Sequence, residues 1–148
     1  MTTISALAET DREEWLPLWA AYIAFYASSV ADDVTATTFA RFLDPDVPMH
    51  AAIARDDDGR AIGFVHWLEH SSTWSRNGYT YLEDLFVDPA SRGGGVGEAL
   101  IAHVSDSARA VGSDKVYWLT AETNTTARRL YDRVARRSGF LHYERELG

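Results

Sequence analysis

A glycine-rich stretch carries the strongest chemical signal in this sequence. Residues 91–100 read SRGGGVGEAL, with three consecutive glycines and a fourth after one valine. Glycine loses more backbone entropy on folding than any other residue, so this density needs a physical reason. Where such a turn opens a helix, an anion can approach free backbone N–H groups and the positive end of the helix dipole. With Arg92 beside it, the stretch predicts a phosphate-binding loop, and a loop without a ligand is the alternative.

Two better-known phosphate loops do not fit these residues. A Walker loop needs a lysine directly after its last glycine, and no lysine follows any glycine here. A dinucleotide-binding loop needs the pattern G-x-G-x-x-G. With Gly93 and Gly95 in the first two positions, the last position is Glu98. Both classes of nucleotide site are therefore excluded for this loop.

Two adjacent carboxylates form a second chemical feature. Glu83 and Asp84 interrupt the apolar run YLEDLFV at 81–87, whose aromatic and branched residues are typical of a strand. Adjacent side chains of a regular strand point to opposite faces, so we expect these two to diverge. A charge is costly to bury inside an apolar strand, so at least one of them should line a wet pocket.

The glycine-rich stretch and its surroundings resemble a known family. Residues 92–97 fit the pattern R/Q-x-x-G-x-G/A of the GNAT N-acetyltransferases, and YLEDLFV precedes them as that family's central strand does. The segment TAETNTTARRLYDRVARRSGF at 120–140 is also similar to the family, and the resemblance covers roughly residues 60–147. Residues 63–87 look most like diamine and thialysine acetyltransferases. The later segment also resembles small acetyltransferases that modify histones, polyamines or amino acids.

The resemblance implies acetyl-coenzyme A as acetyl donor, no metal, and direct transfer to an amine. The residues that would cradle the donor's pyrophosphate are Arg92, Gly93, Gly94, Gly95, Val96, Gly97 and Glu98. Further donor contacts would come from the main chain of Leu85, Phe86 and Val87 and from Asn124, Ala127 and Tyr131. Tyr131 occupies the family's general-acid position. Glu83 matches the acid that helps to deprotonate the amine in the diamine acetyltransferases.

Blander roles for two of these residues stay open on the sequence alone. Tyr131 lies in a helical apolar pattern with Leu130 and Val134, which by itself is more typical of a core residue than of a catalytic one. Asn124 precedes the same pattern and suits a helix N-cap. Asp84 is expected to bind substrate or to form an ion pair.

The acceptor is expected to be a small cationic amine, such as a diamine, a polyamine or a lysine-like amino acid. Glu83, Asp84, Trp67 and Trp74 would offer carboxylates and aromatic faces to an ammonium group. The net charge of −8 agrees with this and argues against nucleic acid or an anionic membrane as partner. The alternatives are a protein tail, an antibiotic amine, and a noncatalytic acyl-coenzyme A sensor that needs neither Tyr131 nor Glu83.

A zinc-hydrolase motif competes with this interpretation. His66 to His70 reads H-x-x-E-H, which binds zinc when both histidines share one helix face. Here the motif follows the apolar run Ile62-Gly63-Phe64-Val65, which predicts a strand. In a strand the two histidines lie about 13 Å apart, too far for one zinc ion.

These residues must be positioned by an α/β (α+β) domain, and the resemblance implies a mixed, mostly antiparallel sheet flanked by helices. Strands are expected near 3–8, in a hairpin at 49–70, and at 79–87, 115–120 and 140–147. Helices are expected near 10–26, 37–43, 94–112 and 125–139. Thr10 and Glu13 have the spacing of a capping box for the first helix, and Gly139 suits the cap that ends the last one.

Length and composition bound the remaining possibilities. The 148 residues fit one domain, with 46% hydrophobic and 24% charged residues as in globular proteins. The chain has no cysteine, which excludes a thiol nucleophile and hence an acetyl-cysteine intermediate. No membrane-spanning stretch or secretory leader is recognised, so a cytoplasmic protein is predicted. The family resemblance implies a homodimer.

Overall fold

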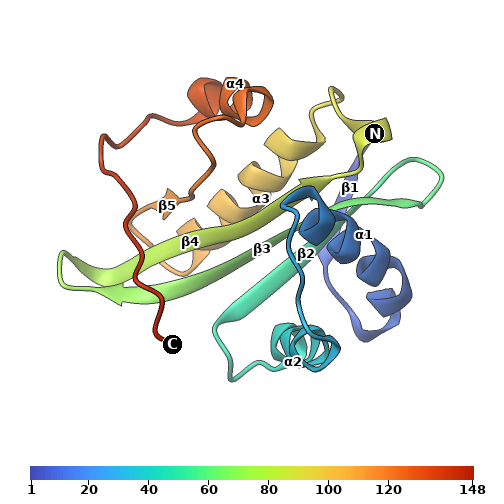
Figure 1. The fold of residues 1–148 in the computed structure, drawn as a ribbon, viewed down its shortest axis with the longest axis horizontal. Helices are drawn as coiled ribbons and strands as arrows, with labels where there is room; N and C mark the ends of the chain where they lie inside the picture. Colours follow the sequence, from blue (N-terminus) through green and yellow to red (C-terminus); the bar gives the residue numbers. More distant parts are fainter.

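A single five-stranded sheet forms the centre of the computed structural model, which describes all 148 residues. The strands run in the order β1-β2-β3-β4-β5 (Figure 1). Their bounds are Thr3–Ala6 for β1, Met49–Arg55 for β2, Ala61–Ser72 for β3, Ser75–Val87 for β4 and Val116–Tyr117 for β5. Neighbours are antiparallel except β4 and β5, which are parallel. The mixed, mostly antiparallel sheet is therefore confirmed.

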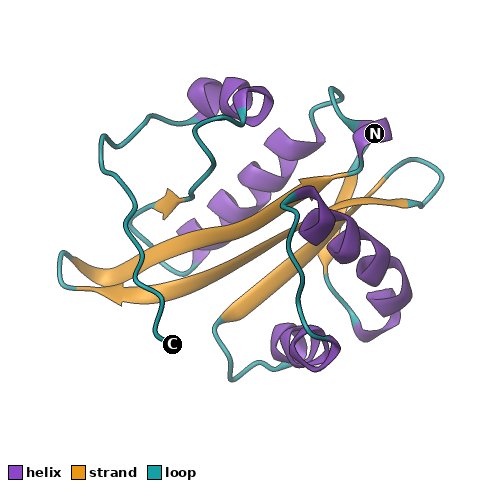
Figure 2. Cartoon of the chain, viewed as in Figure 1, coloured by secondary structure: helices purple, strands orange, loops and turns teal.

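Helices cover both faces of this sheet, as Figure 2 shows. Their bounds are Arg12–Phe25 for α1, Asp32–Leu43 for α2, Val96–Ala110 for α3 and Thr125–Val134 for α4. Alternate residues of β3 supply two separate cores. Phe64 packs with Trp15 of α1 and Phe39 of α2, whereas Val65 packs with Leu100 of α3. None of the helices has the length and apolar character needed to cross a bilayer.

Most of the expected elements are confirmed, with shifts at their ends. The second helix begins earlier than expected, at Asp32. The capping box expected from Thr10 and Glu13 is wrong, because a short 3-10 turn at Glu9–Asp11 precedes α1. There Asp11 accepts a hydrogen bond from the Ala8 amide at 2.8 Å.

The C-terminal part differs most from expectation. The strand expected at 115–120 pairs over only two residues, and α4 ends at Val134, well before Gly139. The strand expected at 140–147 is wrong, because this segment has no regular structure and runs past β5 as coil (Figure 1). Residues 138–142 and β5 both line a cavity of about 1030 Å³, and the segment does not pair with the outer edge of β5.

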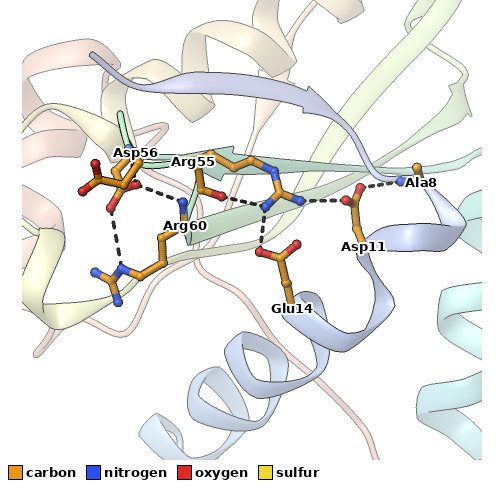
Figure 3. A network of polar contacts seen from close by, with 8 residues as sticks. Ala8, Asp11, Glu14, Arg55, Asp56 and Arg60 are labelled. Carbon is orange, nitrogen blue, oxygen red and sulfur yellow. Dashed lines mark hydrogen bonds and ion pairs between the residues drawn. The ribbon is translucent and has the colours of Figure 1, made fainter.

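One arginine ties the sheet to the helical layer that bears part of the site (Figure 3). Arg55, at the end of β2, contacts Asp11 and Glu14 with its two terminal nitrogens, each at 2.7 Å. The same guanidinium donates to the Gly59 carbonyl in the β2–β3 turn at 3.1 Å. This fork uses the planar donor geometry that lysine lacks.

We expect Arg55→Ala to lower the free energy of unfolding by about 1–3 kcal/mol, because it leaves two carboxylates of a partly buried network without their cation. The matched control is Arg109→Ala, which removes the exposed pair with Asp106 on α3. That change should cost less than about 0.5 kcal/mol. Urea denaturation measures both, and equal costs for the two variants would show that the Arg55 network is not a structural tie.

Candidate active site

A β-bulge brings the two adjacent carboxylates to one side of the sheet. His66 of β3 pairs with Asp84, but the next residue, Trp67, pairs with Leu82, so Glu83 has no partner. Leu82 is buried in the core on the α3 side, and by alternation Glu83 points to the α1 side. Asp84 points there too, because it bonds Tyr22 of α1. The expectation that the two carboxylates diverge is wrong, since the extra residue of a bulge breaks the alternation.

Glu83 is the member of this pair that has no protein partner. Its side chain is exposed and forms no ion pair or hydrogen bond with another residue. Desolvation first, and the charge of Asp84 second, raise its pKa above the usual value for glutamate. A carboxylate with a raised pKa accepts a proton more readily, as a general base requires.

Asp84 is already engaged by protein groups. Tyr22 donates its hydroxyl to one carboxylate oxygen at 2.9 Å, and Nδ1 of His66 lies 2.9 Å from the other. His66 is buried, and desolvation lowers its pKa despite the opposing effect of Asp84. The structure therefore favours the paired alternative for Asp84 over contact with substrate.

The sheet opens beside these carboxylates. β4 and β5 pair only at Thr80–Val116 and Tyr81–Tyr117, where the two tyrosine rings stack at 5.0 Å. Beyond this point β4 continues to Val87, whereas the segment that follows β5 turns away toward α4. The main chain from Leu85 to Val87 is thus paired with β3 on one side only. Its free edge can meet an extended ligand, as expected for the pantetheine arm.

The glycine loop lies at the end of this opening. Gly95 is the N-cap of α3 with a left-handed φ of 83°, and no side chain caps the helix. A Cβ at Gly93 or Gly95 would meet no protein atom within 4 Å. The uncapped N–H groups of the first turn of α3 are therefore open to an anion such as a pyrophosphate.

The neighbours of the loop have mixed roles. The guanidinium of Arg92 lies 5.8 Å from the ring centres of Phe25 and Phe86, and its Nε donates to the Val87 carbonyl at 2.9 Å. A Cβ at Gly97 would come within 3.1 Å of Leu130 of α4, so this glycine serves helix packing. Glu98 pairs with Arg133 at 3.0 Å and links α3 to α4. Donor contacts of Val96 and Glu98 stay predictions.

The fourth helix supplies the expected acid. Asn124 caps α4 by accepting from the Ala127 amide at 3.3 Å, so its capping role is confirmed. Tyr131 packs edge-on against Trp118 at 5.4 Å between ring centres. Burial first, and Tyr26 second, raise its pKa to about 12, so the phenol keeps its proton at neutral pH. Tyr131 also lines the cavity of about 1030 Å³.

The two tryptophans expected near the acceptor lie elsewhere. Trp74 is 90% exposed in the turn between β3 and β4. It precedes Glu83 by nine residues, about 30 Å along an extended strand. Trp67 is buried in the core on the α3 side. Within a single copy of the protein, neither indole lies beside Glu83 or Asp84.

Several residues near the site were not singled out from the sequence. Tyr22 of α1 and Tyr26, the residue that caps the end of α1, have rings 5.1 Å apart, and the sequence showed them only as part of an apolar stripe. His66 drew notice only as half of a zinc motif. Residues 61–72 do form a strand, and His70 bonds Tyr117 at 2.7 Å rather than sharing a ligand with His66.

Comparison with known proteins decides the family. The model of the acetyltransferase (GNAT) family matches residues 6–135. The chain belongs to the GNAT family of acetyltransferases. It is thus an acetyl-coenzyme A-dependent N-acetyltransferase, and the predicted family, enzyme class and fold are confirmed.

Individual relatives extend this match. The D-amino-acid N-acetyltransferase HPA3 of Saccharomyces cerevisiae is 38% identical over 143 residues, which cover 96% of this GNAT chain and 89% of that protein. The mycothiol acetyltransferase of Clavibacter michiganensis is 31% identical over 135 residues, but these cover only 41% of that protein. Among solved structures, the aminoglycoside N-acetyltransferase AAC(6')-Iy with a bisubstrate analogue has a TM-score of 0.86 at 22% identity, covering 100% of this chain and 99% of that one. This likeness shows the shared fold.

The glycine loop of this acetyltransferase can be tested with a matched pair of substitutions. Gly95→Ala and Gly59→Ala both place a Cβ at a left-handed φ with no atom within 4 Å. Each should cost about 1 kcal/mol of stability. Only Gly95→Ala should weaken acetyl-coenzyme A binding, by about tenfold or 1.4 kcal/mol, because its methyl group lies where the pyrophosphate approaches. Calorimetry measures both, and equal affinities in the two variants would contradict the cradle.

Proposed function

We propose that this acetyltransferase moves the acetyl group directly onto the primary amine of a small molecule, with Glu83 as base and Tyr131 as acid. The observation that carries the proposal is the opening between β4 and β5. Glu83 lies in the bulge of β4, two residues after Tyr81. Tyr81 stacks on Tyr117, and Tyr117 lines the same cavity as Tyr131. These contacts support a raised-pKa base on β4 and a protonated acid on α4 that act on the same opening.

The two residues meet different needs of the reaction. A protonated amine of pKa about 10.4 cannot attack, so Glu83 removes one proton from it through a water molecule. The amine nitrogen then bonds to the acetyl carbon, and the carbon–sulfur bond breaks. Tyr131 gives its proton to the departing thiolate, and the nitrogen releases its second proton to solvent as the amide forms. Glu83 then returns its proton to solvent and Tyr131 takes one up, so both groups are restored. The products are the N-acetylated amine and free coenzyme A, and no covalent enzyme intermediate forms.

Contacts to the acetyl donor follow from the same geometry. The open turn at Gly93–Gly95, with the cation of Arg92, suits the pyrophosphate. The free edge of Leu85–Val87 suits the amides of the pantetheine arm, apart from the Val87 carbonyl that accepts from Arg92. Asn124 and Ala127 begin α4 on the far side of the opening. Their part in donor binding is indirect, since the cap fixes the helix that carries Tyr131.

For the acceptor we propose a free amino acid. The support is the D-amino-acid N-acetyltransferase that is 38% identical over 96% of this chain. A strongly cationic pocket has less support, because Asp84 is engaged and the two tryptophans lie away from Glu83. Lysine-like amino acids belong to the proposed acceptor class, whereas diamines and polyamines form the alternative acceptor class.

A panel of amines tests the acceptor. We expect thiol release from acetyl-coenzyme A to be fastest with free amino acids, and faster with D- than with L-enantiomers, followed at matched concentrations. A diamine or an aminoglycoside that exceeds every amino acid in kcat/KM would move the acceptor to that class. Tight donor binding with no turnover on any amine would support the noncatalytic sensor instead.

Tyr131→Phe isolates the acid. Phenylalanine keeps the ring against Trp118 but removes the proton, so we expect kcat to fall about a hundredfold, with acetyl-coenzyme A affinity nearly unchanged. Because the pKa of Tyr131 is about 12, the wild-type phenol stays protonated, and the loss should be constant between about pH 6 and 9. An unchanged kcat in steady-state assays where chemistry limits turnover would reduce Tyr131 to a packing residue.

We also propose that two copies associate through the C-terminal segment. Phe140, Leu141, Tyr143 and Leu147 are exposed on a coil that runs past the outer edge of β5, which pairs only with β4. Phe140 and Leu141 also line the cavity of about 1030 Å³. Burial of such apolar side chains in a second copy would stabilise a homodimer. The location in the cytoplasm and the lack of nucleic-acid partners stay predictions from the sequence.

The dimer can be tested by sedimentation. Leu141→Glu should shift the protein from dimer to monomer, since a charge cannot be buried unpaired in an apolar contact. The matched control is Val111→Glu, at an exposed apolar position that ends α3. This control should stay dimeric. A wild-type chain that sediments as a monomer at micromolar concentration would contradict the proposal.

A further inference from the structure

A buried histidine behind the carboxylates has both ring nitrogens committed. His66 is only 2% exposed, and four aromatic rings surround it. The rings are those of Trp15, Trp19, Phe42 and Phe64, with centres 4.4 to 5.9 Å from the imidazole. Trp15 Nε1 lies 3.1 Å from Nε2 of His66, and Asp84 lies 2.9 Å from Nδ1.

These contacts fix the protonation state of the ring. An indole N–H can only donate, so Nε2 of His66 must present its lone pair to Trp15. A neutral imidazole carries one N–H, which then lies on Nδ1 and is donated to Asp84. To charge the ring, Nε2 would have to take a proton, lose the bond to Trp15 and become a cation among aromatic side chains.

The neutral ring leaves the charge of Asp84 uncompensated. His66 and Tyr22 each donate one hydrogen bond to Asp84, which takes part as a carboxylate acceptor. No lysine or arginine pairs with Asp84 or Glu83. The bulge then places this fixed negative charge beside Glu83 on the same side of the sheet.

We infer that Asp84 is a positioning residue whose charge, fixed by neutral His66 and by Tyr22, increases the basicity of Glu83. The inference rests on the proposed function, in which Glu83 is the base. It assigns the Trp15–His66–Asp84–Tyr22 network to tuning of the reaction rather than to contact with the acceptor.

The other ionisable groups around the pair do not offset this charge. Tyr81 of β4, Tyr117 of β5 and Tyr22 of α1 all have raised pKa values, so their phenols are neutral in the working range. His66 of β3 has a lowered pKa and is neutral as well. The direction of the Glu83 shift agrees, since Asp84 is its second cause after desolvation.

The test is the pH profile of kcat/KM for Asp84→Asn. The wild-type profile should rise with pH through the pKa of Glu83, which the charge of Asp84 raises. This rising part of the profile is its acid limb. Removal of the Asp84 charge should move the acid limb to lower pH and lower the plateau of kcat/KM by about three- to tenfold, because the base is weaker. Tyr22→Phe is the matched variant. It removes one hydrogen bond but no charge, and should leave the midpoint of the limb in place.

A merely structural Asp84 gives a different result: lower thermal stability and a uniform rate loss, with the limb unmoved. That result would overturn the inference. Glu83→Gln separates the underlying proposal, since it should abolish the limb. A limb that persists in Glu83→Gln would show that another group is the base, whatever Asp84→Asn does.

A measurement on the unaltered enzyme covers the case in which Asp84→Asn fails to fold. Long-range ¹H–¹⁵N spectra of histidine-labelled protein report which imidazole nitrogen is protonated. The His66 signal, assigned by its absence in His66→Gln, should show N–H on Nδ1 at every pH from about 5.5 to 8. A proton on Nε2, or a titration in this range, would contradict the fixed neutral ring.

Discussion

The two-residue pairing between β4 and β5 is the constraint on which the rest of the site depends. Parallel strands usually continue side by side, but here only Thr80 and Tyr81 of β4 find partners on β5. The unpaired edge of β4 beyond Tyr81 would be a liability in most sheets, because open N–H and C=O groups invite a foreign strand. In an acetyltransferase the extended arm of the donor can satisfy the same groups.

The remaining elements hold this opening in shape. The bulge lets Glu83 stay exposed while its neighbours Leu82 and Asp84 are held by the α3 core and the α1 layer. Buried polar networks are costly when incomplete, and this one is complete, since no buried side-chain polar atom lacks a partner. Arg55 ties α1 to the sheet from the opposite end. The rigid layer behind β4 thus allows the front edge to remain open.

Local sequence patterns were enough to predict a large part of the fold and some of the candidate site. The glycine loop, the β2–β3 hairpin and the strand–turn–helix unit from Tyr79 to Ala110 depend on neighbouring residues, and their order matched the family and the fold. The capping role of Asn124 was also visible as a local alternative. The bulge at Glu83 was not visible, because register depends on a strand that lies far away in the sequence.

Residues 140–147 and His66 show that local sequence patterns do not reveal contacts with residues far away in the chain. Residues 140–147 were expected to form a strand, yet a strand also needs a partner, and this segment pairs with none. His66 belonged to a recognisable motif, but its state is set by Trp15, 51 residues away. Trp74 is only nine residues from Glu83 in the sequence, but the extended β3–β4 hairpin separates the two side chains in space.

Direct transfer at the opening between β4 and β5 is most directly tested by two-substrate initial-rate kinetics. Acetyl-coenzyme A is varied at several fixed concentrations of an accepted amino acid, and double-reciprocal lines are drawn for each. A ternary complex, in which the amine attacks the bound thioester, requires lines that intersect. Parallel lines would indicate a covalent acetyl-enzyme, and would contradict the transfer mechanism built on Glu83 and Tyr131.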